Sequence, residues 1–217
     1  MCRTQFVCAM LVGIFIVGSR SIAGDLVEGS DDRAKPMKQA LAALIKEIDG
    51  GDFEKAKALY AGSGADLDLL KAYVDGVATA KTMRAAMQAK FGDHLKRPLA
   101  GLDSDVTRMA VCDFNSVIFL DDPDRASSSA NSPLGVGIEF KRVGGDWKVL
   151  SLASAPDSAE EHLTRLKNYI TAVGTIAENL KSGAYNTPQD AAKAADEARR
   201  QLWPELRGSA PATRPIK

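Results

Sequence analysis

The sequence is poor in the residues that form disulfides and histidine metal sites. Its 217 residues include three cysteines and two histidines. Cys2 and Cys8 lie close to the N-terminus, so the rest of the chain contains only Cys112. A single cysteine cannot form an intramolecular disulfide, and the fold must therefore be stabilised by a hydrophobic core. We expect Cys112 to be a buried hydrophobic residue, with a free thiol or an intermolecular link as the alternatives.

The motifs of several common active sites are missing. Two histidines are too few for a histidine-rich zinc site, and Glu160-Glu161-His162 lacks the second histidine of a zinc-protease helix. The acidic run Asp121–Asp124 lacks the later glutamate of a calcium-binding loop. A Gly-x-Ser-x-Gly nucleophile motif does not occur. The sequence therefore predicts no metal ion, no cofactor and no catalytic residue of these types.

The sequence also lacks an excess of charge of either sign. It contains 28 lysine and arginine residues against 28 aspartate and glutamate residues. A nucleic-acid-binding domain usually carries a clear basic excess on one face, and no cluster of basic residues supplies one here. Nucleic acid is therefore excluded as a predicted partner.

The N-terminal apolar run is shorter than a transmembrane helix. It covers 13 residues, Phe6 to Gly18, follows Arg3, and precedes the small residues Ser21 and Ala23. This order is typical of a secretory signal peptide. We therefore predict a signal peptide over residues 1–23, cleavage near Ala23, and export to the periplasm or the medium. Membrane tethering by an uncleaved segment is the alternative, and no membrane span is predicted after cleavage.

Helical periodicity follows a polar linker over residues 24–35. The spacing of apolar residues predicts helices over residues 37–48, 53–60 and 65–91. In the third helix the apolar stripe rotates by about 100° along its length. This helix is therefore expected either to bend near Gly76 or to pack its two halves on different neighbours.

Residues 105–152 are rich in β-branched and aromatic residues, which is typical of strands. The predicted strands are Val106–Asp113, Ser116–Leu120, Leu134–Val143 and Trp147–Leu152. The polar segment Asp121–Pro133 is predicted to be a loop or a disordered excursion. Two more helices are predicted after residue 156, one starting at the capping box Ser158–Glu161 and one at the cap Thr187.

The paired glycines of this region are interpreted as structural. A phosphate-binding loop places its glycines between a strand and a helix. Gly135 and Gly137 lie within a predicted strand, and Gly144-Gly145 separates two predicted strands. The second pair therefore predicts a hairpin turn, and Trp147 is expected to pack across the sheet.

The stretch "LIKEIDGGDFEKAKALYA", residues 44–61, resembles the opening of nuclear transport factor 2-like domains, and "GDWKV", residues 145–149, is similar to their final hairpin. The resemblance covers residues 37–152. It implies an α+β fold over residues 36–155, in which N-terminal helices pack on a curved four-stranded antiparallel sheet to form a cone with an apolar pocket. Two C-terminal helices would follow as an extension over residues 156–205, before a loose tail over residues 206–217.

This fold suggests a binding function rather than catalysis. We expect a small apolar ligand or a protein partner for an exported, non-catalytic module. The candidate pocket-lining residues are Tyr73, Met83, Met87, Asp113, Ile138 and Phe140. The alternative is a cone-cavity isomerase or hydrolase that would use some of Tyr73, His94 and Asp113. A helical adaptor is less favoured because the sequence has no repeat.

Overall fold

The structure is a computed structural model that describes residues 25–28, 32–92, 101–111, 116–120, 122–128, 138–153 and 158–203. The predicted signal peptide and the predicted C-terminal tail lie outside these residues. The described helices are α1 (Lys35–Gly50), α2 (Phe53–Ala58), α3 (Ala65–Phe91), α4 (Leu102–Val111), α5 (Ala159–Ser182) and α6 (Pro188–Leu202). The described strands are β1 (Asp25–Glu28), β2 (Ser116–Phe119), β3 (Arg125–Ser128), β4 (Glu139–Val143) and β5 (Asp146–Ser151).

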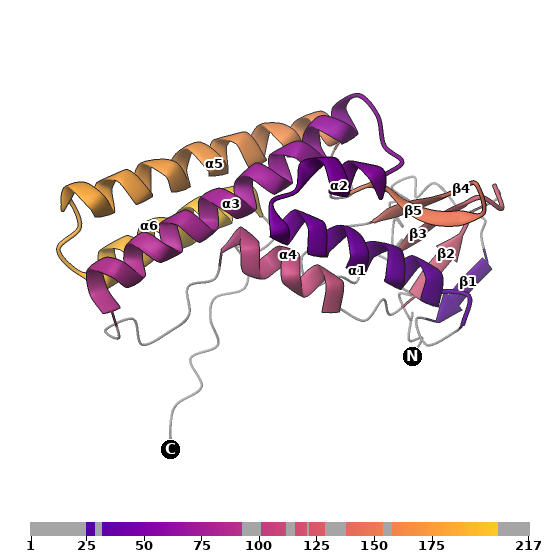
Figure 1. The fold of residues 1–217 in the computed structure, drawn as a ribbon, viewed down its shortest axis with the longest axis horizontal. Coiled ribbons are helices and arrows are strands. Elements are labelled where there is room, and N and C mark those ends of the chain that lie inside the picture. The colour runs from indigo at the N-terminus through magenta and orange to yellow at the C-terminus, as the bar shows by residue number, and fades with distance from the viewer. Residues whose placement is uncertain are drawn as a thin grey trace, which may run out of the picture.

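The strands form one antiparallel sheet in the order β1-β2-β3-β4-β5 at one end of the molecule (Figure 1). The β4–β5 hairpin turns at Gly144 and Gly145, whose φ angles are 63° and 95°. These positive angles favour glycine, so the predicted hairpin turn is confirmed. Helix α1 contacts β5, and Ala126, Phe140 and Val149 are buried on the sheet.

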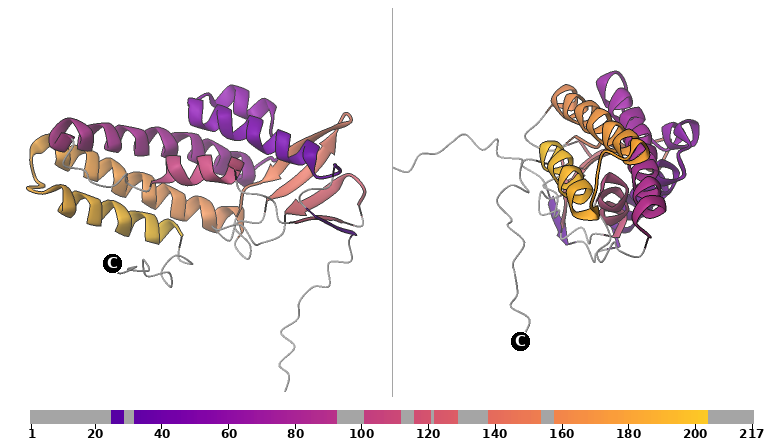
Figure 2. Two further views of the ribbon diagram at one scale, coloured as in Figure 1. Left: turned by 90° about the horizontal axis from the view of Figure 1, so that it is seen from below. Right: turned by 90° about the vertical axis from the view of Figure 1, so that its left-hand side faces the viewer.

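Helices α3, α5 and α6 form a long bundle that extends away from the sheet (Figures 1 and 2). The contact between α3 and α5 is the most extensive between any two described elements. The predicted capping box at Ser158 and the predicted cap at Thr187 are both confirmed at the starts of α5 and α6. Helix α3 also contacts α1, α2 and α4. Its apolar stripe therefore packs on different neighbours along the helix. This is one of the two arrangements that the rotation of the stripe predicted.

The prediction of helices on a four-stranded cone is wrong. Most of the predicted strand Val106–Asp113 is helical, because it continues α4, in which Leu102 and Val106 are buried four residues apart. The predicted linker contains β1, and the predicted loop Asp121–Pro133 contains β3. Helix α5 is no peripheral extension, because it packs along α3 in the centre of the bundle.

No helix of the described segments is both long enough and apolar enough to span a bilayer.

Candidate functional site

Most of the predicted pocket residues belong to the hydrophobic core. Five of them are buried: Tyr73, Met83, Met87, Ile138 and Phe140. Asp113, and also His94 and Cys112, lie outside the described residues. The two grooves described below are lined by other residues. Among the candidates that are described, only Tyr73 makes a recorded side-chain hydrogen bond, and its partner is not one of the other candidates.

Tyr73 is paired with His162, a residue that sequence reasoning assigned no role. The Tyr73 hydroxyl lies 2.8 Å from Nε2 of His162, and both side chains are fully buried. The two rings are also stacked, with centroids 5.7 Å apart. Trp203, just after α6, packs against His162, with their ring centroids 5.2 Å apart. The cluster thus joins the first turn of α5 to α3 and to the end of α6.

The chemistry of this cluster is that of a structural contact. Burial raises the pKa of Tyr73 well above its ordinary value, so the phenol stays protonated at neutral pH. It can donate to or accept from Nε2, depending on the histidine tautomer. Because neither ring reaches solvent, a substrate could contact this pair only after the helices separated.

The first turn of α4 forms a second polar cluster. The Asp105 carboxylate, at 0% exposure, accepts hydrogen bonds from Nε and Nη2 of Arg199 on α6, at 2.6 and 2.8 Å. Asp103 accepts a 2.8 Å hydrogen bond from Nη2 of Arg84 on α3. Two acidic residues in the first turn also suit the positive end of the helix dipole. Both aspartates therefore tie α4 to other helices.

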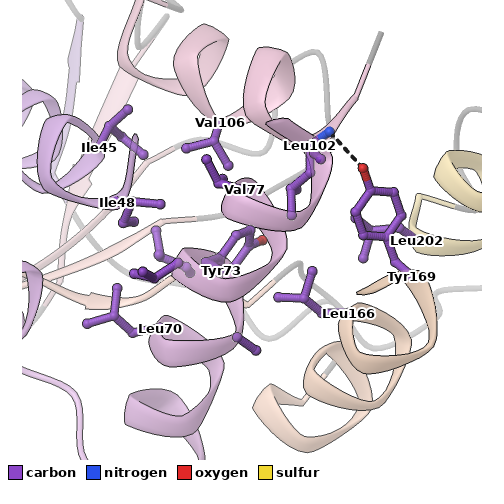
Figure 3. Close-up of a cluster of buried hydrophobic side chains, with 14 of the residues drawn as sticks. Ile45, Ile48, Leu70, Tyr73, Val77, Leu102, Val106, Leu166, Tyr169 and Leu202 are labelled. Atoms are coloured by element: carbon purple, nitrogen blue, oxygen red, sulfur yellow. Dashed lines mark hydrogen bonds between the residues drawn. The ribbon is translucent and has the colours of Figure 1, made fainter. Parts of the chain in front are cut away.

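Tyr169 on α5 completes this cluster, and Figure 3 shows its hydroxyl directed at Leu102. Its hydroxyl accepts a 3.1 Å hydrogen bond from the backbone N–H of Leu102, a group that α4 itself leaves unpaired. Burial raises the pKa of Tyr169 to about 12. The hydrogen bond to Asp105 raises the pKa of Arg199 above its ordinary value. We call this set of six residues the α4 junction: Arg84, Leu102, Asp103, Asp105, Tyr169 and Arg199.

An accessible groove lies between α3 and α5. Its cavity volume is about 610 Å³. The lining residues come from adjacent turns of the two helices: Asp68, Lys71, Ala72, Asp75, Lys167, Ile170 and Thr171. Next to it the helices approach closely at Gly76, where an added Cβ would lie 2.6 Å from a Leu102 methyl and 3.4 Å from Ile170. The groove therefore borders a point where α3 packs closely on α4 and α5.

The α3–α5 groove combines an apolar floor with charges of both signs. Ala72 and Ile170 are the apolar lining residues, and Lys71 pairs with Asp75 across one turn at 2.9 Å. Asp68 and Lys167 form no ion pair with any described residue. A second groove of about 560 Å³ runs along α6 and is lined by mostly charged residues. Of these two grooves, only the α3–α5 groove is lined by a branched aliphatic side chain, Ile170, together with charges of both signs that form no ion pair within the described residues.

Sequence reasoning missed both polar clusters and the groove. Asp103 and Asp105 carried a local signal, since acidic residues often occupy the first turn of a helix. Their arginine partners are 19 and 94 residues away, and no local pattern links such positions. Among the described residues, no group of three or more histidine, cysteine, aspartate or glutamate side chains could hold a metal ion. Comparisons with models of protein families, with curated proteins and with solved structures find no match to this chain.

Proposed function

We propose that this chain is an exported, non-catalytic module that binds a small amphipathic ligand in the α3–α5 groove. The observation that carries the proposal is the groove itself, with its apolar floor and its unpaired Asp68 and Lys167. A volume of about 610 Å³ falls in the range of small-molecule sites. Export is inferred from the sequence of residues 1–23 alone.

The arrangement of the interior polar groups supports binding over catalysis. Tyr73, His162 and Asp105 have the functional groups that a general acid or base needs. Tyr73 and His162 are hydrogen-bonded to each other, and Asp105 is held by Arg199. All three are buried and none lines the α3–α5 groove. A ligand in the groove would instead contact Ile170 and the charged rim.

The groove can be tested by filling it. Thr171→Phe places an aromatic ring in the groove, and Thr175→Phe places the same ring one turn further along α5. The two threonines are matched, because both are exposed and each hydroxyl donates to the backbone carbonyl four residues earlier. Neither change removes a buried contact, so we expect both variants to fold.

The probe is anilinonaphthalene sulfonate, which has apolar rings and one anionic group, and its affinity is measured by isothermal titration calorimetry. We expect Thr171→Phe to weaken binding about tenfold or more. The added ring would displace the probe from one or two of its apolar contacts in the groove. Thr175→Phe should bind as the unmodified chain does. Equal affinities in all three proteins, or no binding to the unmodified chain, would contradict the proposal. If the probe binds in the groove, native mass spectrometry of the exported protein would identify any small molecule that it carries.

A further inference from the structure

The two helices that form the α3–α5 groove run side by side in the same direction (Figures 1 and 2). Near the start of the groove, the Tyr73 hydroxyl contacts His162. About one turn further along, an added Cβ at Gly76 would lie 3.5 Å from Cδ1 of Leu166 and 3.4 Å from Cγ1 of Ile170. Residue numbers on the two helices therefore rise together along the groove.

This alignment separates the unpaired acid of the groove from its unpaired base. Asp75 precedes Gly76 and Lys167 follows Leu166, so Asp75 and Lys167 start from about the same level of the groove. Asp68 lies two turns before Asp75 on α3. Because an α-helix rises 1.5 Å per residue, Asp68 and Lys167 are about 10 Å apart along the helix axes.

The rest of the groove lining is neutral overall. The ammonium group of Lys71 lies 2.9 Å from a carboxylate oxygen of Asp75 and 5.9 Å from the centre of the Phe53 ring. This ion pair adds no net charge to the groove. The apolar lining residues are Ala72, which is buried, and Ile170, which is partly exposed. A ligand along the groove would therefore meet one anionic position, an apolar surface and one cationic position.

From this order of charges we infer that the ligand of the α3–α5 groove is a short apolar peptide with both termini free. Its ammonium group binds Asp68, its carboxylate binds Lys167, and an apolar side chain packs on Ile170. An extended peptide advances about 3.3–3.6 Å per residue, so about three residues span the separation. The inference rests on the proposed function, because it names the ligand class of the same groove.

The side chain of Thr171 suits a peptide backbone. Its hydroxyl donates a 3.0 Å hydrogen bond to the carbonyl of Lys167, and the hydroxyl oxygen can still accept a hydrogen bond. A peptide N–H can supply that hydrogen bond. The Thr171 hydroxyl therefore lies next to the position that would bind the carboxylate end of the peptide.

Smaller or singly charged ligands fit the groove less completely. An organic anion would leave Asp68 without a partner, and an amine would leave Lys167 without one. A single amino acid carries its ammonium and carboxylate groups on the same carbon, so it is too short to reach both positions. Only a ligand with opposite charges at its two ends matches the whole groove.

The test is isothermal titration calorimetry of the full chain with three peptides that share the sequence Ala-Leu-Ala. The first has free termini, the second is N-acetylated and has lost its ammonium group, and the third is a C-terminal amide that has lost its carboxylate. All three keep the leucine side chain. We expect the free peptide to bind, and each cap to raise the dissociation constant about fivefold, which is the effect of one solvent-exposed charge pair.

Two variants assign each terminus to its residue. Asp68→Asn should weaken binding of the free peptide about fivefold and leave binding of the acetylated peptide unchanged. Lys167→Gln should weaken binding of the free peptide to the same extent and leave binding of the amidated peptide unchanged. The matched controls are Asp196→Asn and Lys193→Gln, at exposed positions of α6 that line the second groove. They should bind all three peptides as the unmodified chain does.

The inference is wrong if the three peptides bind the unmodified chain with equal affinity. It is also wrong if Asp68→Asn weakens binding of the free and acetylated peptides by the same factor, or if the α6 controls lose as much affinity as the groove variants. If no peptide binds but anilinonaphthalene sulfonate binds and Thr171→Phe weakens it, the inference fails and the proposed function stands. If neither the peptides nor this probe binds, both fail.

Discussion

The α4 junction and the β4–β5 hairpin both concentrate charged side chains, but they arrange them in opposite ways. In the junction each aspartate meets an arginine from another helix, and Asp105 is completely buried. In the hairpin and the adjacent β3, Lys141 faces Lys148 and Arg125 across the strands in contact with solvent. Water screens the repulsion in the hairpin, whereas an unpaired charge in the junction would have no solvent to stabilise it. Burial therefore decides whether charges must be paired.

The largest effect is expected from breaking one ion pair in each region. Asp105→Asn removes the charge that holds Arg199, and it should reduce the free energy of unfolding by about 3–5 kcal/mol because an uncompensated cation is left partly buried. Glu139→Gln breaks the Arg125 pair, which is equally short at 2.7 Å but about 40% exposed on both sides. This change should cost about 0–1 kcal/mol.

Urea unfolding at neutral pH measures both values. Similar losses in the two variants would mean that burial does not distinguish the two regions. A double variant, Asp105→Asn with Arg199→Met, should recover part of the loss, since it removes the unpaired charge as well.

Alkaline pH tests the junction without mutation. Burial raises the pKa of Tyr169 to about 12 in the folded chain, from an ordinary value of 10. The unfolded chain therefore ionises first, and stability that is fully present below about pH 10 is lost as the pH rises toward about 12. The loss is about 2–3 kcal/mol for this residue, and burial acts in the same direction on Tyr60 and Tyr73.

The matched variant is Tyr169→Phe. It should be about 1 kcal/mol less stable at neutral pH, since the N–H of Leu102 loses its acceptor. Between about pH 9 and pH 11.5 its stability should fall less steeply than that of the unmodified chain. Urea unfolding across this range decides the matter, and parallel pH profiles would show that the Tyr169 hydroxyl does not resist ionisation.

The last two variants test backbone packing at two glycines, one beside the sheet and one inside α5. An added Cβ at Gly62 would lie 2.5 Å from the Leu150 carbonyl oxygen, so Gly62→Ala forces the backbone apart. We expect it to lower stability by about 1–3 kcal/mol. Gly174, inside α5, has nothing within 4 Å of an added Cβ. Gly174→Ala should therefore raise stability by about 0.5–1 kcal/mol, through helix propensity.

Thermal unfolding of these two variants should give shifts of opposite sign, because an added Cβ meets the Leu150 carbonyl oxygen at Gly62 and no atom within 4 Å at Gly174. A stabilising effect at both positions would mean that the segment beside β5 can move away from Leu150 at little cost.

Elements with strong local signals were predictable from the sequence. The starts of α5 and α6 follow from Ser158 and Thr187, and the hairpin turn follows from Gly144-Gly145. Strands β1 and β3 were missed because their short sequences, DLVE and RASS, have little β-propensity of their own. The segment around Val106 was assigned to a strand because its β-branched residues outweighed its helical spacing. The pairing of strands and the packing of helices decided the secondary structure of all three segments.

The candidate sites show the same difference between features with a local signal and features that depend on tertiary contacts. The sequence alone determined the scarcity of cysteine and histidine, the balanced charge, the caps and the glycine turn, because these depend on composition or on neighbours within a few residues. The tertiary structure decided that Tyr73 meets His162 and that Asp105 meets Arg199, 89 and 94 residues away. It also decided that three cations align across β3, β4 and β5. Such contacts depend on how helices pack and strands pair, and no local pattern encodes them.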